Sequence, residues 1–204
     1  MKLQRSVTRL GMVLLSLTLA AAAQENKQEI SVQGTGFFTS GSSGNGTAYS
    51  STETGGVLGT YRYHLNRWIS AEGVYGFDVN SQKFQSSSSG FRIQSDIHQI
   101  TGGLVFKLPT RASSRLSPYV LAGGGVLWFD PTGSLTNTVA GAQSQAKATF
   151  VYGVGMSCAL RKRLSLRAEY RGLVYGTPDF GFTGISTNSI AHTAEPSVGL
   201  AFRF

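Results

Sequence analysis

The chain has 204 residues, with 18 Lys and Arg against 10 Asp and Glu, which gives a formal net charge of +8 at pH 7. No nucleic-acid-binding motif accompanies this charge, so we exclude a nucleic-acid partner. Cys158 is the single cysteine of the sequence, which excludes an internal disulfide and leaves stability to backbone hydrogen bonds and packing.

The first 23 residues have the three parts of a secretory signal peptide. Three basic residues within the first nine positions precede an apolar core at 12–19 and small residues at 21–23. The apolar core is well short of the roughly 20 residues that a membrane-spanning helix needs. We therefore expect export and cleavage near Gln24, which leaves residues 24–204 as one domain.

After the expected signal peptide, no segment has the periodicity of an amphipathic helix, whereas apolar and polar residues alternate in eight segments. In the first segment Ile30 and Val32 share one face, and Glu29 and Gln33 share the other. The segments lie at about 28–38, 55–65, 68–79, 91–108, 118–129, 147–160, 164–171 and 195–204. Tilted strands of about ten residues are long enough to cross a bilayer. The sequence therefore predicts an all-β fold, an eight-stranded antiparallel up-and-down transmembrane β-barrel with its apolar face toward lipid.

The connections between these segments alternate in length. Short connections lie at 64–67, 109–115 and 160–163, and long ones, rich in Ser, Thr, Gly and Asn, lie at about 40–54, 80–90, 130–146 and 176–191. Barrels of the outer membrane have short periplasmic turns and longer extracellular loops. We therefore expect four long extracellular loops, with both termini on the periplasmic side.

Aromatic residues gather at two levels of the predicted strands. Near the short connections lie Tyr61, Tyr63, Trp68, Tyr119, Phe202 and Phe204, and near the long connections lie Phe37, Phe38, Phe77, Trp128, Phe129 and Tyr175. Two such bands are typical of the girdles at the two membrane interfaces. The alternative is a soluble lipocalin-like barrel, which has no need of two aromatic bands.

The last segment carries apolar side chains at every second position up to the final residue, namely Val198, Leu200, Phe202 and Phe204. This ending resembles the C-terminal assembly signal of outer-membrane barrel proteins. Together with the glycine-rich segments 118–125 and 150–155, it makes the mature chain similar to small eight-stranded barrels of the OmpA, OmpX and opacity-protein type. The resemblance implies a bacterial outer-membrane location, with outer-membrane lipid, lipopolysaccharide and the barrel-assembly machinery as partners. It implies a fold and a location, and no activity.

Alternation directs a set of charged side chains into the lumen, namely Arg62, Glu72, Arg167, Glu169, Arg171 and Glu195. The interior of an eight-stranded barrel is just wide enough for side chains to fill. Opposite charges there are expected to pair, since an unpaired buried charge is costly. We interpret this lumen charge network as a plug, and the alternative is a gate or a narrow ion path.

The occupancy of the lumen separates these two roles. Small inward residues leave space, namely Gly76, Gly103, Gly124, Gly153, Gly155 and Gly199. Trp128 and the lumenal arginines are expected to refill it. In the fifth segment this orientation assigns Tyr119, Leu121 and Leu127 to the lipid face.

The best-placed catalytic candidate is His192, which lies beside Thr193 and near Thr187 and Ser189. A base beside a hydroxyl can activate a nucleophile. A lipid A deacylase of this barrel type has a serine two places after the histidine, however, and here that place holds Ala194. The three histidines also lie far apart in the sequence and at different levels of the barrel. We therefore predict no enzyme activity, no metal site and no cofactor.

These observations favour a non-enzymatic protein with a structural or surface-interaction role, in which the long loops meet an extracellular ligand. The alternative function is a narrow porin-like channel for ions or small solutes. The two functions differ in whether the lumen conducts.

Overall fold

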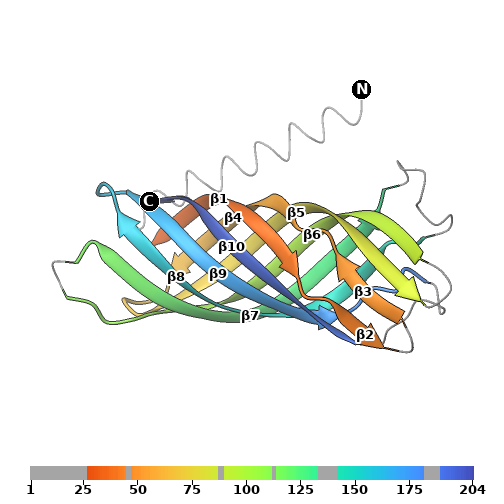
Figure 1. Ribbon diagram of the computed structural model, residues 1–204. Coiled ribbons are helices and arrows are strands. Elements are labelled where there is room, and N and C mark those ends of the chain that lie inside the picture. Colours follow the sequence, from red (N-terminus) through yellow and green to blue (C-terminus); the bar gives the residue numbers. More distant parts are fainter. Residues whose placement is uncertain (1–26, 45–46, 87–89, 112–113, 133–141, 182–188) are drawn as a thin grey trace, which may run out of the picture.

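The computed structural model describes residues 27–44, 47–86, 90–111, 114–132, 142–181 and 189–204. The expected signal peptide, residues 1–23, lies outside the described residues. Over the described part, the strands tilt across a common axis and form a β-barrel (Figure 1). No helix in that part of the chain is long and apolar enough to cross a membrane.

Ten strands are described, and eight of them close the barrel. They are β1 (Gln28–Thr39), β2 (Ser42–Gly44), β3 (Thr47–Ser51), β4 (Thr54–His64), β5 (Ile69–Ser86), β6 (Gly90–Lys107), β7 (Leu116–Pro131), β8 (Gln145–Ala159), β9 (Leu164–Gly176) and β10 (Ile190–Arg203). β1 and β4 to β10 form the ring, each antiparallel to its neighbour, and β10 closes it on β1 with Ile30 opposite Phe202. The short hairpin β2–β3 pairs with β5 outside the ring. The predicted eight-stranded antiparallel barrel is confirmed.

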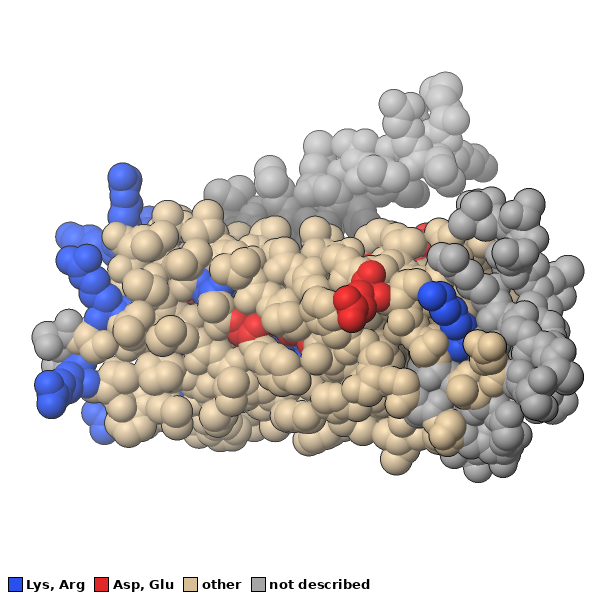
Figure 2. Space-filling view, viewed as in Figure 1, with Lys and Arg blue, Asp and Glu red and all other residues tan. Residues whose placement is uncertain are grey.

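Alternation along the strands separates an apolar outer wall from a filled interior. Val32 is 71% exposed, whereas its neighbours Ser31 and Gln33 are buried. Exposed aliphatic and aromatic side chains repeat this pattern around the outer wall. Figure 2 shows Lys and Arg gathered mostly at one end of the barrel. An apolar outer band is the arrangement that a bilayer requires.

The two ends of the barrel differ in their connections. The turns β4–β5, β6–β7 and β8–β9 lie at the end where β1 begins and β10 finishes, and we call it the short-turn end. The opposite end, which holds the hairpin β2–β3 and the connections β7–β8 and β9–β10, is called the long-loop end. The predicted alternation of short and long connections is therefore present at β1–β4, β7–β8 and β9–β10, but not at β5–β6, where the connection is residues 87–89.

Some residues expected in loops belong to the sheet instead. β5 and β6 each run for 18 residues, so the connection expected at 80–90 shrinks to residues 87–89, which lie outside the described part. The connection expected at 40–54 contains the hairpin β2–β3. These segments are rich in polar residues on both faces, so they lack the contrast between faces that marks a lipid-facing strand.

The predicted orientation of β7 is wrong. Tyr119, Leu121 and Leu127 are buried in the lumen, whereas Trp128 is 52% exposed on the outer wall and Gly124 also faces outward. β7 carries large apolar side chains at both odd and even positions, so its composition does not reveal which face meets lipid. Its pairing with β6 and β8 decides the orientation.

Four aromatic residues expected in the girdles lie inside the barrel, namely Phe37, Tyr119, Phe129 and Tyr175. They belong to one buried apolar cluster in the lumen. Other residues predicted in the girdles do lie on the outer wall, with Trp68 and Phe202 near the short-turn end and Phe38 and Trp128 near the long-loop end. The aromatic residues therefore mark both the membrane interfaces and the core.

Candidate functional site in the barrel lumen

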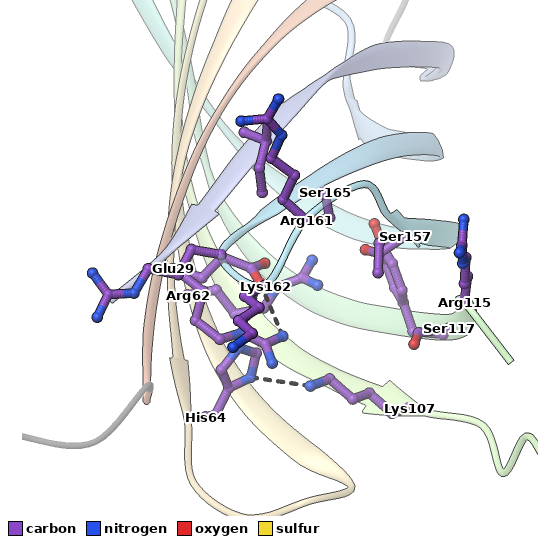
Figure 3. A pocket seen from close by; sticks show the side chains of 15 residues that line it. Glu29, Arg62, His64, Lys107, Arg115, Ser117, Ser157, Arg161, Lys162 and Ser165 are labelled. Carbon is purple, nitrogen blue, oxygen red and sulfur yellow. Dashed lines mark hydrogen bonds and ion pairs between the residues drawn. The ribbon is translucent and has the colours of Figure 1, made fainter. Parts of the chain in front are cut away.

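At the short-turn end the lumen opens into a cavity of about 170 Å³, which we call the mouth cavity (Figure 3). It lies between His64 at the end of β4, Lys107 at the end of β6 and Arg161 in the β8–β9 turn. Glu29 and Arg62 also line it. Arg62 belongs to the lumen charge network and Glu29 pairs with Arg167 of that network, so the network closes the mouth cavity toward the middle of the barrel.

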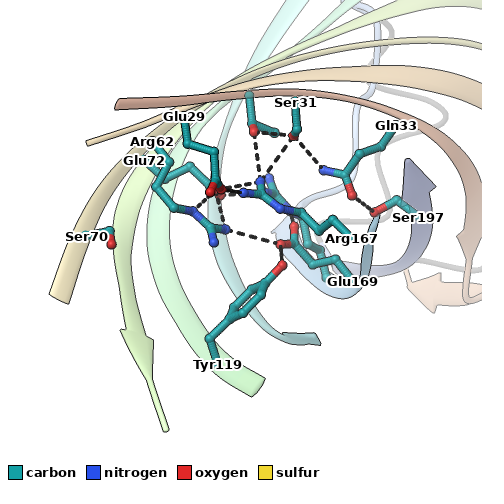
Figure 4. Close-up of polar contacts among 12 residues, drawn as sticks. Glu29, Ser31, Gln33, Arg62, Ser70, Glu72, Tyr119, Arg167, Glu169 and Ser197 are labelled. Atoms are coloured by element: carbon teal, nitrogen blue, oxygen red, sulfur yellow. Dashed lines mark hydrogen bonds and ion pairs between the residues drawn. The ribbon is translucent and has the colours of Figure 1, made fainter. Parts of the chain in front are cut away.

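Glu72 on β5 is the centre of the lumen charge network (Figure 4). Its Oε2 accepts a hydrogen bond from Nε of Arg62 (2.8 Å), and its Oε1 accepts one from Nη2 of Arg171 (2.6 Å). Nη1 of Arg167 lies 3.5 Å from the same carboxylate. Arg62 faces Glu72 in the β4–β5 register, whereas the two other arginines reach it from β9. One carboxylate therefore joins three guanidinium groups from two sides of the barrel.

Arg167 is fully buried, and several acceptors replace the water around its guanidinium group. It pairs with Glu29, and its Nη1 donates to Oγ of Ser31 (3.1 Å) and to Oγ1 of Thr60 (3.0 Å). Nη2 of Arg203 donates to Glu29 as well, over 3.1 Å. These contacts connect β9 with the strands on both sides of the β1–β10 seam.

Glu169 is the third acceptor of the network. It pairs with Arg171 on the same strand, and its Oε2 lies 3.6 Å from Nη2 of Arg62. The hydroxyl of Tyr119 donates to Glu169 over 2.6 Å. The guanidinium carbon of Arg62 lies 4.5 Å from the centre of the Tyr119 ring, which adds a cation–π contact.

Five of the six charged residues expected in the lumen thus lie together, namely Arg62, Glu72, Arg167, Glu169 and Arg171. Glu195 is buried beside them, opposite Arg171 in the β9–β10 register, but no ion pair within 4.0 Å joins it to a described residue, and Nε2 of Gln99 lies 3.5 Å from its Oε2. Within the described residues, its Oε1 and both carboxylate oxygens of Asp78 have no hydrogen-bond partner. Glu29 and Tyr119 join the network without having been predicted as members. The inward register of Glu29 in the sequence could have identified it as a member. Tyr119 could not be identified, because the predicted orientation of β7 was wrong.

Toward the long-loop end, apolar side chains fill the lumen, including Phe37, Ile93, Ile97, Leu127, Phe129, Leu173, Tyr175 and Phe180. Phe180 follows β9 and has a φ of 51°, which bulky residues rarely adopt. The side-chain oxygen of Gln145 accepts hydrogen bonds from the N–H groups of Asp179 (2.9 Å) and Phe180 (3.3 Å). The buried ring of Phe180 meets Phe129 edge-on at 6.3 Å, and this burial offsets the strained backbone. The lumen therefore contains a charged layer and an apolar layer in series.

The catalytic candidate His192 does not lie on the same face of β10 as Thr193, the hydroxyl beside it in the sequence. His192 lies on the outer face of β10, where its Nε2 is 2.8 Å from the hydroxyl of Tyr152. Thr193 is fully buried on the opposite face, and Thr187 lies outside the described residues. Nor does any group of three or more His, Cys, Asp or Glu side chains in the described part have an arrangement suited to a metal ion.

The fold is similar to that of three solved outer-membrane proteins. OprG from Pseudomonas aeruginosa is 15% identical over 88% of this chain and 96% of its own, with a TM-score of 0.62. Neisserial surface protein A is 16% identical over 86% of this chain and 97% of its own, with a TM-score of 0.54. Ail from Yersinia pestis, solved in complex with the heparin analogue sucrose octasulfate, is 18% identical over 87% of this chain and 99% of its own, with a TM-score of 0.50. At these identities the likeness concerns the fold alone.

The sequence also matches a family profile over almost its whole length. No curated protein matches the chain. The profile described as outer membrane protein beta-barrel domain matches residues 11–204, a range that contains every described strand. The chain therefore belongs to the outer membrane protein β-barrel domain family, and its location is the bacterial outer membrane.

Proposed function

We propose that this chain is a non-enzymatic barrel that keeps its lumen closed and acts through its extracellular surface. The observation that carries the proposal is the filling of the lumen by two layers. In the charged layer Arg62, Arg167 and Arg171 are at most 1% exposed, and the apolar layer lies between them and the long-loop end. The short-turn end faces the periplasm and the long-loop end faces outward, as in other barrels of this membrane. A solute would have to displace both layers to cross.

The extracellular surface contains ordered sheet that extends beyond the ring. β3 pairs with the outer part of β5, where Tyr49 lies opposite Phe84, and β5 pairs with β6 as far as Gln85 opposite Gly90. An ordered surface loses less conformational entropy on binding than a flexible one. This property supports the sheet formed by β2, β3 and the outer parts of β5 and β6 as the surface that meets an extracellular ligand.

The charges at the long-loop end bear on the chemistry of that ligand. Ail was solved with a heparin analogue, and a polyanion of that kind is attracted by clustered cations. Here the long-loop end carries both signs, with Lys83 and Lys147 against Asp179. Burial opposes the ionisation of Asp179, but hydrogen bonds from Gln145 and Gly181 hold its pKa below the usual range. The mixture of positive and negative charges at the long-loop end supports a ligand whose hydroxyl and amide groups are recognised, and not a sulfated one.

Outer-membrane lipid and lipopolysaccharide are the proposed partners of the outer wall. Two tyrosine–histidine pairs face outward in the half of the barrel nearer the long-loop end. The hydroxyl of Tyr75 lies 2.8 Å from Nδ1 of His98, and that of Tyr152 lies 2.8 Å from Nε2 of His192. Side chains with an apolar ring and a polar tip are suited to a membrane interface.

A planar-bilayer recording tests whether the lumen is closed. Refolded residues 24–204 are expected to give no discrete current steps at any of several salt concentrations, because both layers block the path. A shift in electrophoretic mobility on heating verifies that the protein in the bilayer is folded. Discrete openings that change with Glu72→Gln or Arg167→Gln, but not with Lys83→Gln, would support the narrow porin-like channel instead.

We also propose that Val198, Leu200, Phe202 and Phe204 form the signal that the barrel-assembly machinery reads. The rings of Phe202 and Phe204 stack with their centres 6.3 Å apart. The backbone N–H of Phe204 donates to the carbonyl of Gln28 over 2.8 Å, and this bond does not depend on the Phe204 side chain. Recognition by the machinery and closure of the barrel can therefore be separated by substitution.

Phe204→Ala is expected to lower the amount of folded protein in the outer membrane of cells severalfold, since it removes the terminal aromatic ring. The purified variant is expected to refold in micelles like the wild type, because the backbone bonds to β1 remain. Immunoblots of outer membranes, with and without heating of the samples, measure the folded fraction. Phe38→Ala removes an exposed ring at the opposite end and serves as the control. Equal yields for both variants would contradict a role of the terminal ring in assembly.

A further inference from the structure

The mouth cavity carries far more positive than negative charge. Six cationic side chains line it in addition to Arg62, namely Lys107, Arg115, Arg161, Lys162, Arg163 and Arg203. Glu29 is the one carboxylate among the lining residues, and it is already paired with Arg167 and Arg203. In Figure 3 the labelled side chains come from several strands and turns around a common opening. The charge of the mouth cavity therefore has no matching counter-charge within its own walls.

In the described part of the chain, the ammonium group of Lys107 lacks a nearby carboxylate. Nζ of Lys107 lies 3.3 Å from Nδ1 of His64, and within the described residues no carboxylate lies within 4.0 Å of it. The hydroxyl of Ser70 lies 2.7 Å from the same ring nitrogen. These contacts at Nδ1 assign the imidazole proton to Nε2. Nε2 faces Oε2 of Glu29 at 3.6 Å, so His64 is oriented by that carboxylate and Lys107 is left without a described carboxylate partner.

The size and the remaining lining fit a small ligand. A cavity of about 170 Å³ is far larger than the roughly 10–15 Å³ that one water molecule needs. The hydroxyls of Ser117, Ser157 and Ser165 add neutral donors to the cationic ones. Arginine forks and lysine ammonium groups together are the usual partners of phosphate and carboxylate oxygens. Lys107 is only partly exposed, so solvent screens its charge less than it screens the charges of the exposed residues at the rim.

We propose that the mouth cavity binds a small multivalent anion with phosphate or carboxylate groups from the periplasmic side. Lys107 donates at its inner end, and Arg161 and Arg115 donate at its rim. The proposal is independent of the ligand at the extracellular surface. Two sources share this chemistry, namely a soluble periplasmic anion and the headgroup of an anionic phospholipid in the inner leaflet.

Titration calorimetry with inorganic pyrophosphate tests the site in residues 24–204 reconstituted into phosphatidylcholine nanodiscs. We expect saturable binding of one pyrophosphate per barrel, with an affinity that falls as salt is added. The double variant Lys107→Gln and Arg161→Gln is expected to weaken binding at least about tenfold, because it removes two charge-assisted hydrogen bonds. Arg161→Gln alone, at an exposed turn, keeps the test valid if the double variant does not fold.

Lys27→Gln with Arg67→Gln is the matched control, because it removes the same charge from the same end without touching the lining of the mouth cavity. The control is expected to change the affinity by less than about twofold, since exposed charges are screened. Absent saturable binding, or an equal loss in the control, would overturn the proposal. In phosphatidylglycerol nanodiscs, loss of pyrophosphate binding by the wild type identifies the headgroup as the occupant, and retained binding identifies a soluble anion.

Discussion

Replacing Glu72 with alanine is expected to lower the free energy of unfolding by about 3 to 5 kcal/mol, the cost of breaking a buried ion pair by removing one partner. The expectation rests on the position of Glu72, whose carboxylate contacts Arg62, Arg167 and Arg171 inside the lumen. Alanine would leave these guanidinium groups with fewer acceptors and no water to replace the lost ones. Urea unfolding of the refolded barrel in micelles measures the change.

Glu72→Gln is expected to destabilise the barrel less than Glu72→Ala, because the amide oxygen still accepts a hydrogen bond. Val57→Ala removes a side chain that is 54% exposed on the outer wall, and it controls for the loss of side-chain bulk. Equal and negligible effects of the two Glu72 variants would contradict a paired, dry interior around this residue. A larger effect of glutamine than of alanine would do so as well.

The fold was predictable where the two faces of a strand differ in polarity. In β1 the contrast between Val32 and its neighbours Ser31 and Gln33 corresponds to the contrast between lipid and lumen, and the structure follows it. In β7 both faces are apolar, since the lumen near the long-loop end is itself an apolar layer. Leu127 and Trp128 are adjacent, large and apolar, but the first is fully buried and the second faces outward. Alternation alone does not distinguish an apolar lumen from lipid.

The sequence predicted which residues form the charged layer better than it predicted which of them contact one another. Alternation placed Glu72 and Arg171 in the lumen, but their contact joins β5 to β9 across the barrel. Such a contact depends on the tilt and stagger of the closed ring, which pairwise patterns do not contain. Glu195 lies opposite Arg171 in the β9–β10 register, but its carboxylate contacts Gln99 on β6 and not the guanidinium group. The excess of cations in the mouth cavity also emerges only after closure, which brings the ends of β4 and β6 beside the β8–β9 turn.

The seam between β1 and β10 provides a steric test of that closure. Gly199 on β10 lies opposite Gln33 on β1. A Cβ atom at Gly199 would overlap with the backbone carbonyl of Val32 and would press on the backbone of Gln33. Both obstacles are backbone atoms of the partner strand, so neither can move aside by rotation of a side chain. The absence of a side chain at Gly199 therefore permits the close approach of the first and last strands.

Gly199→Ala is expected to destabilise the barrel by about 1 to 3 kcal/mol, as overpacking does, toward the upper end because the strands must separate locally. Gly34→Ala is the matched control, since Gly34 lies on the same seam beside Val198 and nothing lies within 4 Å of its added Cβ. The control is expected to change stability by no more than about 0.5 kcal/mol. Urea midpoints of both variants in micelles measure the difference. Equal midpoints would mean that the first and last strands do not approach as closely at Gly199 as the backbone geometry requires. The stability of the seam would then come from the ion pairs around Glu29 and from the backbone hydrogen bonds between β1 and β10.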